Sequence, residues 1–386
     1  MFHHVENLLL SRRISSINAL FANNALRSLA ISLFGIFQPI YIFSLTKSIE
    51  AVLLYTLVVR LGCLFMVFPA GRLIVRFGFR RNVLLSNFFL SGLLIFLLLS
   101  GKSVWFLIPA AIFDIPALLL YWLPLHILII DDSEKGKLGG EISFLNIISH
   151  IFHILPPFVG GIVITLLGFR SLYLLAIALA ILSSIPLFFM PHHKKPRTLE
   201  YGRYLRIFSF PKFSFILHGF EDFFIGTLWP ILMFLVLMSY EKVGSITSLT
   251  LFFTTISLVL IGYFLDRGKV LSFYKVGTLL SLLLFPFRAF VSTVGGVLFI
   301  DSLHSIVRLT QKLPFDYLVY QKATPGFEYE YIVFREVFLD LGRIAALITS
   351  YFVFRMGGSW LAIFLLPSLA NLFIYLFSKE LLESHN

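Results

Sequence analysis

The chain has 386 residues, of which 58% are hydrophobic and only 13% are charged, and its formal net charge is +11. Its mean hydropathy is +0.92. Soluble domains carry roughly 25% charged residues, so these values exclude an ordinary soluble protein and indicate a chain that lipid solvates. The basic excess is typical of the cytoplasmic loops of membrane proteins rather than of nucleic-acid binding.

Twelve apolar stretches have the length of about 20 residues that crossing a bilayer requires. A retained cytoplasmic N-terminus precedes the first, because Arg12 and Arg13 are not followed by a signal-peptide cleavage site. Six stretches precede a basic segment at 191–212 and six follow it. The predicted spans are 18–45, 50–70, 82–100, 103–130, 141–167 and 170–190, then 213–238, 243–264, 270–288, 291–320, 331–355 and 359–378.

Basic residues alternate between the predicted connections, as the positive-inside rule requires. The connections after spans two, six and eight contain Arg72, Arg76, Arg80 and Arg81, then Lys194, Lys195, Arg197, Arg203, Arg206 and Lys212, then Arg267 and Lys269. The opposite connections hold only Lys47, Lys102 and Lys242. We therefore expect a multi-pass protein of the cell (inner or plasma) membrane with both termini in the cytoplasm.

Two connections resemble each other at half the length of the chain. One runs from Gly71 to Arg81 and the other from Gly262 to Lys269, and their first glycines are 262 − 71 = 191 residues apart. Such a repeat indicates two halves of the same topology. The predicted fold class is an all-α integral membrane protein of twelve transmembrane helices in two pseudo-symmetric six-helix bundles. The predicted domains are 1–190 and 213–386, with 191–212 as a cytoplasmic linker.

The first of these connections resembles the loop G-x-x-x-D-R-x-G-R-R/K of the major facilitator superfamily. It matches at Gly71, Arg76, Gly78, Arg80 and Arg81, and it departs at Val75, where the family has Asp; the second copy keeps Gly262, Asp266 and Arg267. The resemblance implies a loop that locks the two halves together in one state of the transporter. Our hypothesis is that Asp266 supplies the latch that Val75 lacks, against the start of the fifth span at 139–143.

A second element, in the fifth span, is similar to the G-P-x-x-G-G element of major facilitator exporters. Its matching residues are Pro157, Gly160 and Gly161, and Pro156 replaces the leading glycine. The alternative interpretation is a kinked helix whose glycine pair lets a neighbouring helix pack closely. The resemblance favours a drug or metabolite efflux protein.

Charged residues inside spans are costly and therefore point to function. The resemblance implies that the first, fourth, seventh and tenth helices line the central cavity. In the first span, Arg27 and Gln38 share a helical face; Arg27 suits an anionic group, or snorkels to the membrane edge. In the fourth span, Asp114 is a lone acid near the middle, which pairs with a cation or takes up protons.

The seventh and tenth spans carry the chemistry that a proton-coupled carrier needs. Glu221 and Asp222 are adjacent acids, and two such groups in a low-dielectric site cannot easily both ionise; alternatively, one pairs with a fixed arginine. His304 and Arg308 follow Asp301 at helical spacing, as a proton relay or as an ion-pair ladder. In the eleventh span, we expect an interhelical ion network of Glu336, Asp340 and Arg343.

No nucleotide-binding loop and no cluster of metal-ligating residues is present in the sequence. We therefore expect no cofactor, no metal and no enzymatic activity. The predicted protein is a monomeric secondary transporter that moves a small solute by alternating access, with protons and the lipid bilayer as its other partners and no nucleic acid. Proton-coupled efflux is the first hypothesis and metabolite uptake by symport the second. A polytopic enzyme acting on lipid and a non-transporting sensor are the alternatives from other classes.

Overall fold

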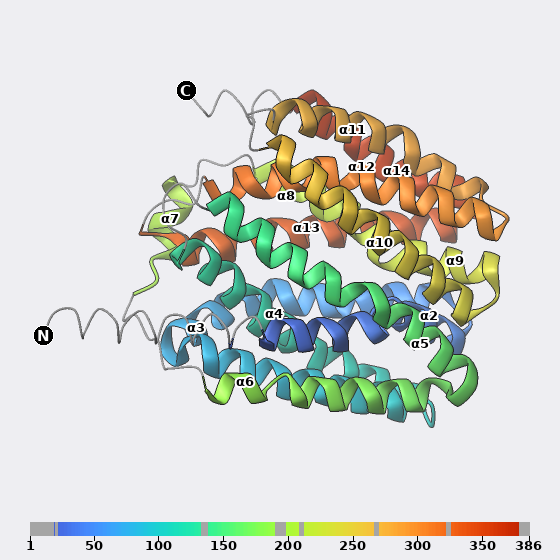
Figure 1. Ribbon diagram of the computed structural model, residues 1–386, viewed down its shortest axis with the longest axis horizontal. Coiled ribbons are helices and arrows are strands. Elements are labelled where there is room, and N and C mark those ends of the chain that lie inside the picture. The colour runs from blue at the N-terminus through green and yellow to red at the C-terminus, as the bar shows by residue number, and fades with distance from the viewer. Residues whose placement is uncertain are drawn as a thin grey trace, which may run out of the picture.

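The computed structural model describes residues 19, 22–132, 138–189, 198–207, 212–265, 270–321 and 326–377, and the side chains of 128–150, 206–207, 259, 262–265 and 321 lie outside this description. Throughout the described ranges, all regular structure is helical. Most helices are long and run side by side along the horizontal axis of Figure 1. Elements from blue to green fill its lower part and elements from yellow to red its upper part, so the two halves of the chain lie against each other.

The first half of the chain begins with a helix over Ala22–Thr46, whose last part is α2 (Phe37–Thr46). It continues with α3 (Ile49–Ser100), a short turn of 3₁₀-helix (Val104–Phe106), α4 (Leu107–Asp132), α5 (Leu138–Leu182) and α6 (Ile185–Phe188). The short helix α7 (Tyr201–Ile207) lies in the predicted linker.

The second half begins with α8 (Lys212–Phe223), which passes through a π-helical turn (Phe224–Leu228) into α9 (Trp229–Leu237). It continues with α10 (Tyr240–Leu265), α11 (Val270–Phe287), a 3₁₀ turn (Arg288–Phe290), α12 (Val294–Gln321), α13 (Glu328–Arg355) and α14 (Trp360–Phe377). Each predicted span thus overlaps a described helix.

Two glycines divide the longest helices. Gly78 in α3 and Gly168 in α5 both have φ 76° and ψ 171°, a conformation open only to glycine, and the helix breaks there. Each helix therefore contains two of the predicted spans. The loop predicted at 71–81 is wrong in extent, because the chain stays helical up to Gly78 and again after it. The amide of Asn82 donates to the carbonyl oxygens of Gly78 (2.7 Å) and Leu73 (3.2 Å), which fixes the turn.

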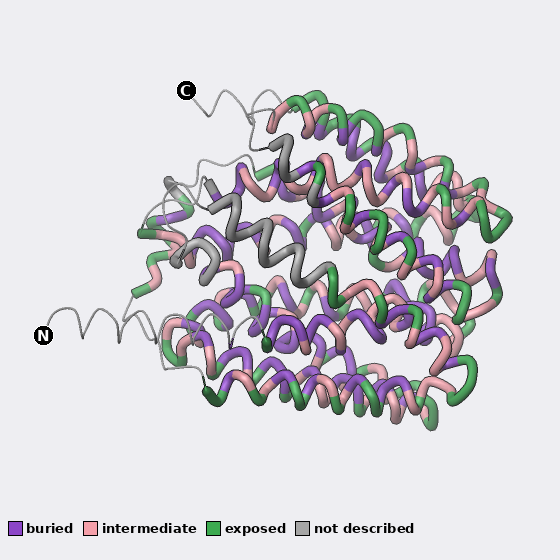
Figure 2. Tube along the Cα trace, in the orientation of Figure 1, coloured by how far each residue is buried: buried purple, intermediate pink, exposed green. Residues whose placement is uncertain are grey.

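The outer surface is suited to lipid. Among the described residues, eight helices are long and apolar enough to span a membrane, and two of them are the divided helices just described. The helix α12 is not among the eight, because it carries Asp301, Arg308, Lys312 and Asp316. Exposed residues follow the outer faces of the helices in Figure 2, and many are large and apolar, including Phe65, Phe88, Leu166, Phe299 and Phe352. Such a surface requires a hydrocarbon solvent.

At the end of the bundle that holds α7, the two halves touch through the linker helix. The hydroxyl of Tyr201 donates to the carbonyl oxygen of Phe68 at 3.2 Å, and a side chain added at Gly71 would meet Tyr201 and Val333. Burial and the nearby carboxylate of Glu330 raise the pKa of the Tyr201 phenol to about 12, so it remains a donor at neutral pH. This region is called the α7 end below.

At the opposite end, called the Gly168 end below, the halves meet through small residues and rings. The hydroxyls of Ser44 and Tyr240 lie 3.2 Å apart, and the Tyr240 ring packs on Phe169 at 5.2 Å between centroids. A side chain added at Gly161 would collide with the backbone of Tyr240 and Glu241. The described contacts between the halves therefore occur at both ends of the molecule.

Candidate functional site

A cavity of about 490 Å³ lies between the two halves of the chain. Helices of both halves contribute to its walls, and ten charged side chains line it: Arg60, Glu221, Asp222, Arg308, Lys312, Asp316, Arg335, Glu336, Asp340 and Arg343. Arg60 comes from α3, and the other nine come from α8, α12 and α13. The charge of the cavity is therefore held almost entirely by the second half.

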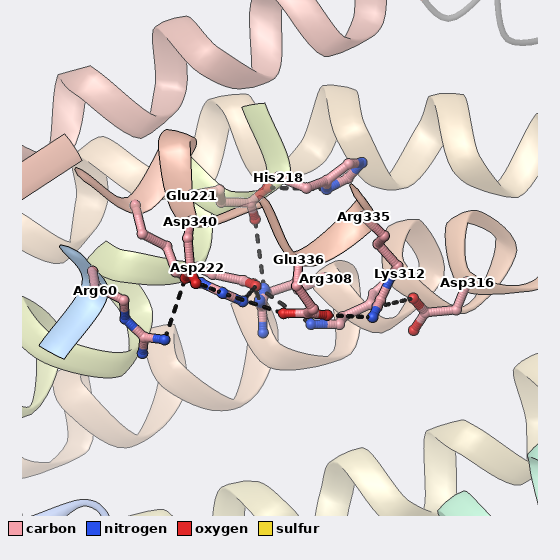
Figure 3. A network of polar contacts seen from close by, with 11 residues as sticks. Arg60, His218, Glu221, Asp222, Arg308, Lys312, Asp316, Arg335, Glu336 and Asp340 are labelled. Atoms are coloured by element: carbon pink, nitrogen blue, oxygen red, sulfur yellow. Dashed lines mark hydrogen bonds and ion pairs between the residues drawn. The ribbon is translucent and has the colours of Figure 1, made fainter. Parts of the chain in front are cut away.

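Asp222 of α8 is the centre of the ion network drawn in Figure 3. It pairs with Arg308, and its two oxygens lie 3.5 Å from the Lys312 ammonium and 3.5 Å from the Arg343 guanidinium. The neighbouring Glu221 lies 3.5 Å from Arg308 Nε. Asp222 is thus embedded among three cations, an arrangement that favours the ionised form of a buried carboxylate. The described ion partners of Glu221 are Arg308 and, at 4.0 Å, His218. A π-helical turn begins at Phe224, two residues after Asp222, and such turns are frequent at functional sites.

A second group of ion pairs runs along α13. Arg343 lies 2.7 Å from Asp340 and 3.7 Å from Glu336. Asp340 also faces Arg60 of α3 at 3.5 Å, so this carboxylate joins the two halves. Of the three residues that were expected to form an interhelical network, Asp340 and Arg343 make ion pairs with α3 and α8, whereas the described ion partners of Glu336 are Arg335 and Arg343 of its own helix. All three line the cavity.

The network extends towards the α7 end through Arg335. Its guanidinium lies 2.7 Å from Glu336 and 3.7 Å from Asp316 of α12. Asp316 follows Lys312 by four residues and Arg308 by eight, so the three form one stripe of α12. Of these three residues only Arg308 was predicted from the sequence as a site residue, although the same helical spacing also places Lys312 and Asp316 on its face.

The wall of the cavity from the first half is neutral apart from Arg60. Its aromatic part is on α4, where the Trp122 ring, 42% exposed, stacks on His126 with centroids 5.9 Å apart. A ring nitrogen of His126 lies 2.5 Å from the Tyr320 hydroxyl of α12 and so bridges the halves. No acidic side chain of the described first half lines the cavity.

Arg27, predicted to face a substrate, is instead enclosed within the first half. It is 2% exposed and does not line the cavity. Its guanidinium donates to Asn87, to Ser86 (2.9 Å) and to the carbonyl oxygen of Ala117 (2.9 Å), and it stacks 3.9 Å from the Tyr121 ring. These partners satisfy a buried cation without an acid, so the described environment is that of a structural residue.

Gln38 and Asp114 lie together, also away from the cavity lining. The Gln38 amide donates to Asp114 Oδ2 at 3.2 Å, and the hydroxyl of Tyr55 donates to the same oxygen at 3.2 Å. Asp114 makes no ion pair with a described residue; Arg60 attracts it from beyond ion-pair distance. A buried carboxylate held only by neutral donors is unusual.

His304, the remaining predicted site residue, belongs to a separate cluster in the second half. Its Nδ1 accepts a hydrogen bond from Arg288 Nε at 2.9 Å. The same guanidinium lies 3.3 Å from Asp301, which also accepts a 2.8 Å bond from Trp229 Nε1. His304 does not line the cavity. The stripe of Asp301, His304 and Arg308 expected on one face therefore divides, and only Arg308 reaches the central network.

The two halves place an acid in the same way but neutralise it differently. Gln38 and Trp229 are 229 − 38 = 191 residues apart, the separation of the two loop glycines. Each donates to a carboxylate on the fourth helix of its own half, Asp114 or Asp301. Only Asp301 has an arginine partner among the described residues. The pseudo-symmetric pair therefore consists of one ion-paired and one unpaired carboxylate.

The motif residues have packing roles where they are described. A side chain added at Gly160 would meet the backbone of Leu33 and the ring of Phe37, while Gly161 and Pro157 face the start of α10. Gly71 faces α7 and α13, and Gly78 makes the turn. Arg76, Arg80 and Arg81 lie near that turn, with Arg80 5.8 Å from the Phe188 ring. Gly262 lies in α10, whereas Asp266 and Arg267, and the side chains of 139–143, lie outside the described residues.

Comparison with known proteins agrees with this architecture. A family model described as Major Facilitator Superfamily matches residues 20–213, half of the chain. None of the curated protein sequences compared with the chain matches it. Among solved structures, the E. coli fucose:proton symporter has a TM-score of 0.70 at 13% identity, covering 95% of this chain and 99% of its own.

Two further structures show the same fold. A bacterial homologue of the iron transporter ferroportin, in an outward-facing state, has a TM-score of 0.70 at 17% identity, over 95% of this chain and 99% of its own. The human organic anion transporter MFSD10 has a TM-score of 0.66 at 14% identity, and the match covers 93% of this chain and 99% of that transporter. The chain belongs to the major facilitator superfamily. It is a multi-pass membrane protein of a family of transporters, not of enzymes.

Proposed function

We propose that the protein is a secondary transporter that binds a small solute in the central cavity and couples its passage to protonation of Asp114. The observation that carries the proposal is the position of the cavity, between helices of both halves and with contacts between the halves at either end. A solute site at the meeting of two six-helix bundles is accessible from each side in turn when the bundles rock. Residues 1–190 and 213–386 are the two moving bodies, and 191–212 is the linker.

Asp114 is the proposed proton site because its described hydrogen-bond partners are neutral. Gln38 and Tyr55 can serve both protonation states, since the phenol and the amide oxygen can reorient. Asp222, in contrast, is paired with Arg308, Lys312 and Arg343, which favour its charged form. Proton uptake and release are therefore assigned to the first half and solute binding to the charged wall of the second.

Efflux in exchange for protons is the proposed direction. The element of Pro157, Gly160 and Gly161 resembles that of exporters, and it lies at the contact with α10 that has to open for release at the Gly168 end. The α7 end is the cytoplasmic one, because Arg72, Arg76 and Arg81 are exposed beside it. The proposed carrier works as a monomer.

The test is an exchange assay with the purified protein in liposomes loaded with a pH-sensitive dye. A panel of solutes is presented on one side, and both solute counterflow and lumenal pH are followed. The proposal expects exchange without chemical change of the solute, accompanied by proton movement. Exchange that leaves the dye unchanged would contradict proton coupling, while a chemically altered solute, or no exchange of any solute, would contradict transport itself.

A further inference from the structure

We propose that the cavity selects organic anions, with a carboxylate or similar acidic group at Lys312 and a flat apolar part against Trp122. This inference rests on the proposed transport function and names the class of its solute. The ten charges of the cavity are five cations and five acids, so net charge alone does not decide between an anion and a cation. The exposure of the individual charged side chains decides between the two.

The most exposed charged side chain of the network is a cation. Lys312 is 44% exposed and Arg60 27%, whereas Glu221 and Asp340 are 2% and 3% exposed. Both of these buried acids lie against arginines, Arg308 and Arg343, and the more exposed Asp222 is engaged by three cations. A solute in the cavity therefore meets Lys312 as its most accessible charge, beside an acid that is already paired.

Lys312 is also the least satisfied of these cations. Its single described ion pair is with Asp222, at 3.5 Å, which is beyond ordinary hydrogen-bond distance. Asp222 shares its two oxygens with Arg308 and Arg343 as well, so one carboxylate serves three cations. The ammonium has donors left for an incoming acidic group.

The opposite wall excludes a cationic solute and favours a flat one. The described lining of the first half contains no acid to pair with an ammonium group, and its charged member, Arg60, repels one. Trp122 presents 42% of its surface and is held by its stack on His126. Aromatic solutes gain from stacking on such a ring beyond the burial of their apolar area.

Binding of a charge-matched series to the purified protein tests this assignment. The probes are 2-naphthoate, the neutral 2-naphthylmethanol and the cationic 2-naphthylmethylammonium, with acetate as an anion that lacks the ring. Isothermal titration in lipid nanodiscs is expected to give at least about tenfold tighter binding of 2-naphthoate than of the other two naphthyl probes, and weaker binding of acetate. Equal or tighter binding of the neutral or cationic probe, or no binding of 2-naphthoate, would overturn the proposal.

Variants assign the effect to its residues. Lys312→Met should weaken 2-naphthoate binding at least about tenfold, whereas Lys312→Arg retains most of it. Lys242→Met removes the same charge from an exposed lysine at the Gly168 end and should change nothing. Trp122→Ala should weaken 2-naphthoate but not acetate. Thermal unfolding of each variant without ligand shows that it is folded, and unchanged 2-naphthoate affinity in folded Lys312→Met contradicts the assignment.

Counterflow of the same probes separates the two proposals. Charge-selective binding that depends on Lys312, without any exchange across the membrane, upholds the solute class and contradicts transport. Exchange of the ammonium or the alcohol, independent of Lys312, upholds transport and contradicts the solute class.

Discussion

The guanidinium of Arg60 lies 3.5 Å from the carboxylate of Asp340, and this ion pair joins α3 to α13 across the cavity. Among the described residues that line the cavity, no other ion pair joins the two halves. Asp340 keeps a second partner, Arg343, at 2.7 Å. Removing Arg60 therefore leaves no unpaired buried acid, and the pair can be tested without unfolding the protein.

Arg60→Gln should favour the states in which the halves have separated. A partly exposed ion pair is worth about 1 kcal/mol or less, which corresponds to a shift in balance of up to about fivefold. The readout is the rate at which a maleimide labels Cys63, the sole thiol of the chain, which is buried in the cavity wall. Labelling should accelerate relative to Arg81→Gln, which removes an exposed arginine; equal rates would show that the pair does not hold the halves together.

Asp114→Asn should retain solute exchange and lose its dependence on pH. The amide can accept from Gln38 or Tyr55 in place of the carboxylate, so the helix contacts persist. A single titrating group changes a rate by up to about tenfold per pH unit. The exchange rate of the variant should stay constant over the same pH range. The measurement is counterflow between pH 5 and 8. The double variant Arg288→Met/Asp301→Asn, which removes the acid of the second half together with its arginine, serves as the control and should keep its pH dependence. A pH-dependent Asp114→Asn assigns the proton elsewhere.

Arg288→Met should destabilise the protein without touching the cavity. Arg288 is 1% exposed and neutralises Asp301 at 3.3 Å, so its removal leaves a buried charge without a partner. Such changes cost about 3–5 kcal/mol, visible as a lower unfolding temperature in detergent. The double variant Arg288→Met/Asp301→Asn should recover most of the loss. Arg355→Met, at an exposed position near the end of α13, is the matched control, and an equal unfolding temperature in both single variants would refute the argument.

Gly219→Ala should separate α8 from α13. A methyl group there would overlap the carbonyl oxygen of Leu339, and Gly342 faces the carbonyl oxygen of Ile216 in the same manner. Overpacking of this kind costs about 1–3 kcal/mol, and because Asp222 and Asp340 are on these two helices, solute binding should weaken as well. Gly226→Ala, where nothing lies within 4 Å, tests the same substitution without a neighbour. Similar unfolding temperatures of the two variants would mean that α8 and α13 can move apart without loss of stability.

The fold could be predicted from the sequence to a large extent, because each signal is local. Hydropathy locates the spans, and Gly78 stands where only a glycine can turn the chain. The length of the connection could not be predicted in the same way, since the stretch from Gly71 to Phe77 carries a glycine and two arginines and yet remains helical.

The candidate site was only partly predictable, because helical periodicity identifies a face but not the neighbour that it meets. Glu221, Asp222 and Arg308 line the cavity as anticipated. Arg27 and His304 do not, since each is enclosed by polar partners from its own half, Ser86 and Asn87 for one and Arg288 for the other. Lys312 was missed because the stripe was followed only as far as Arg308.

The unequal neutralisation of Asp114 and Asp301 has an electrical consequence. The Asp301–Arg288 pair carries no net charge, whereas Asp114, as the proposed proton site, adds a negative charge whenever its proton has left. In that mechanism the deprotonated and protonated carriers differ by one elementary charge, on which a membrane potential acts with about 2.3 kcal/mol per 100 mV for a full crossing. Voltage should thus act unequally on the two reorientation steps.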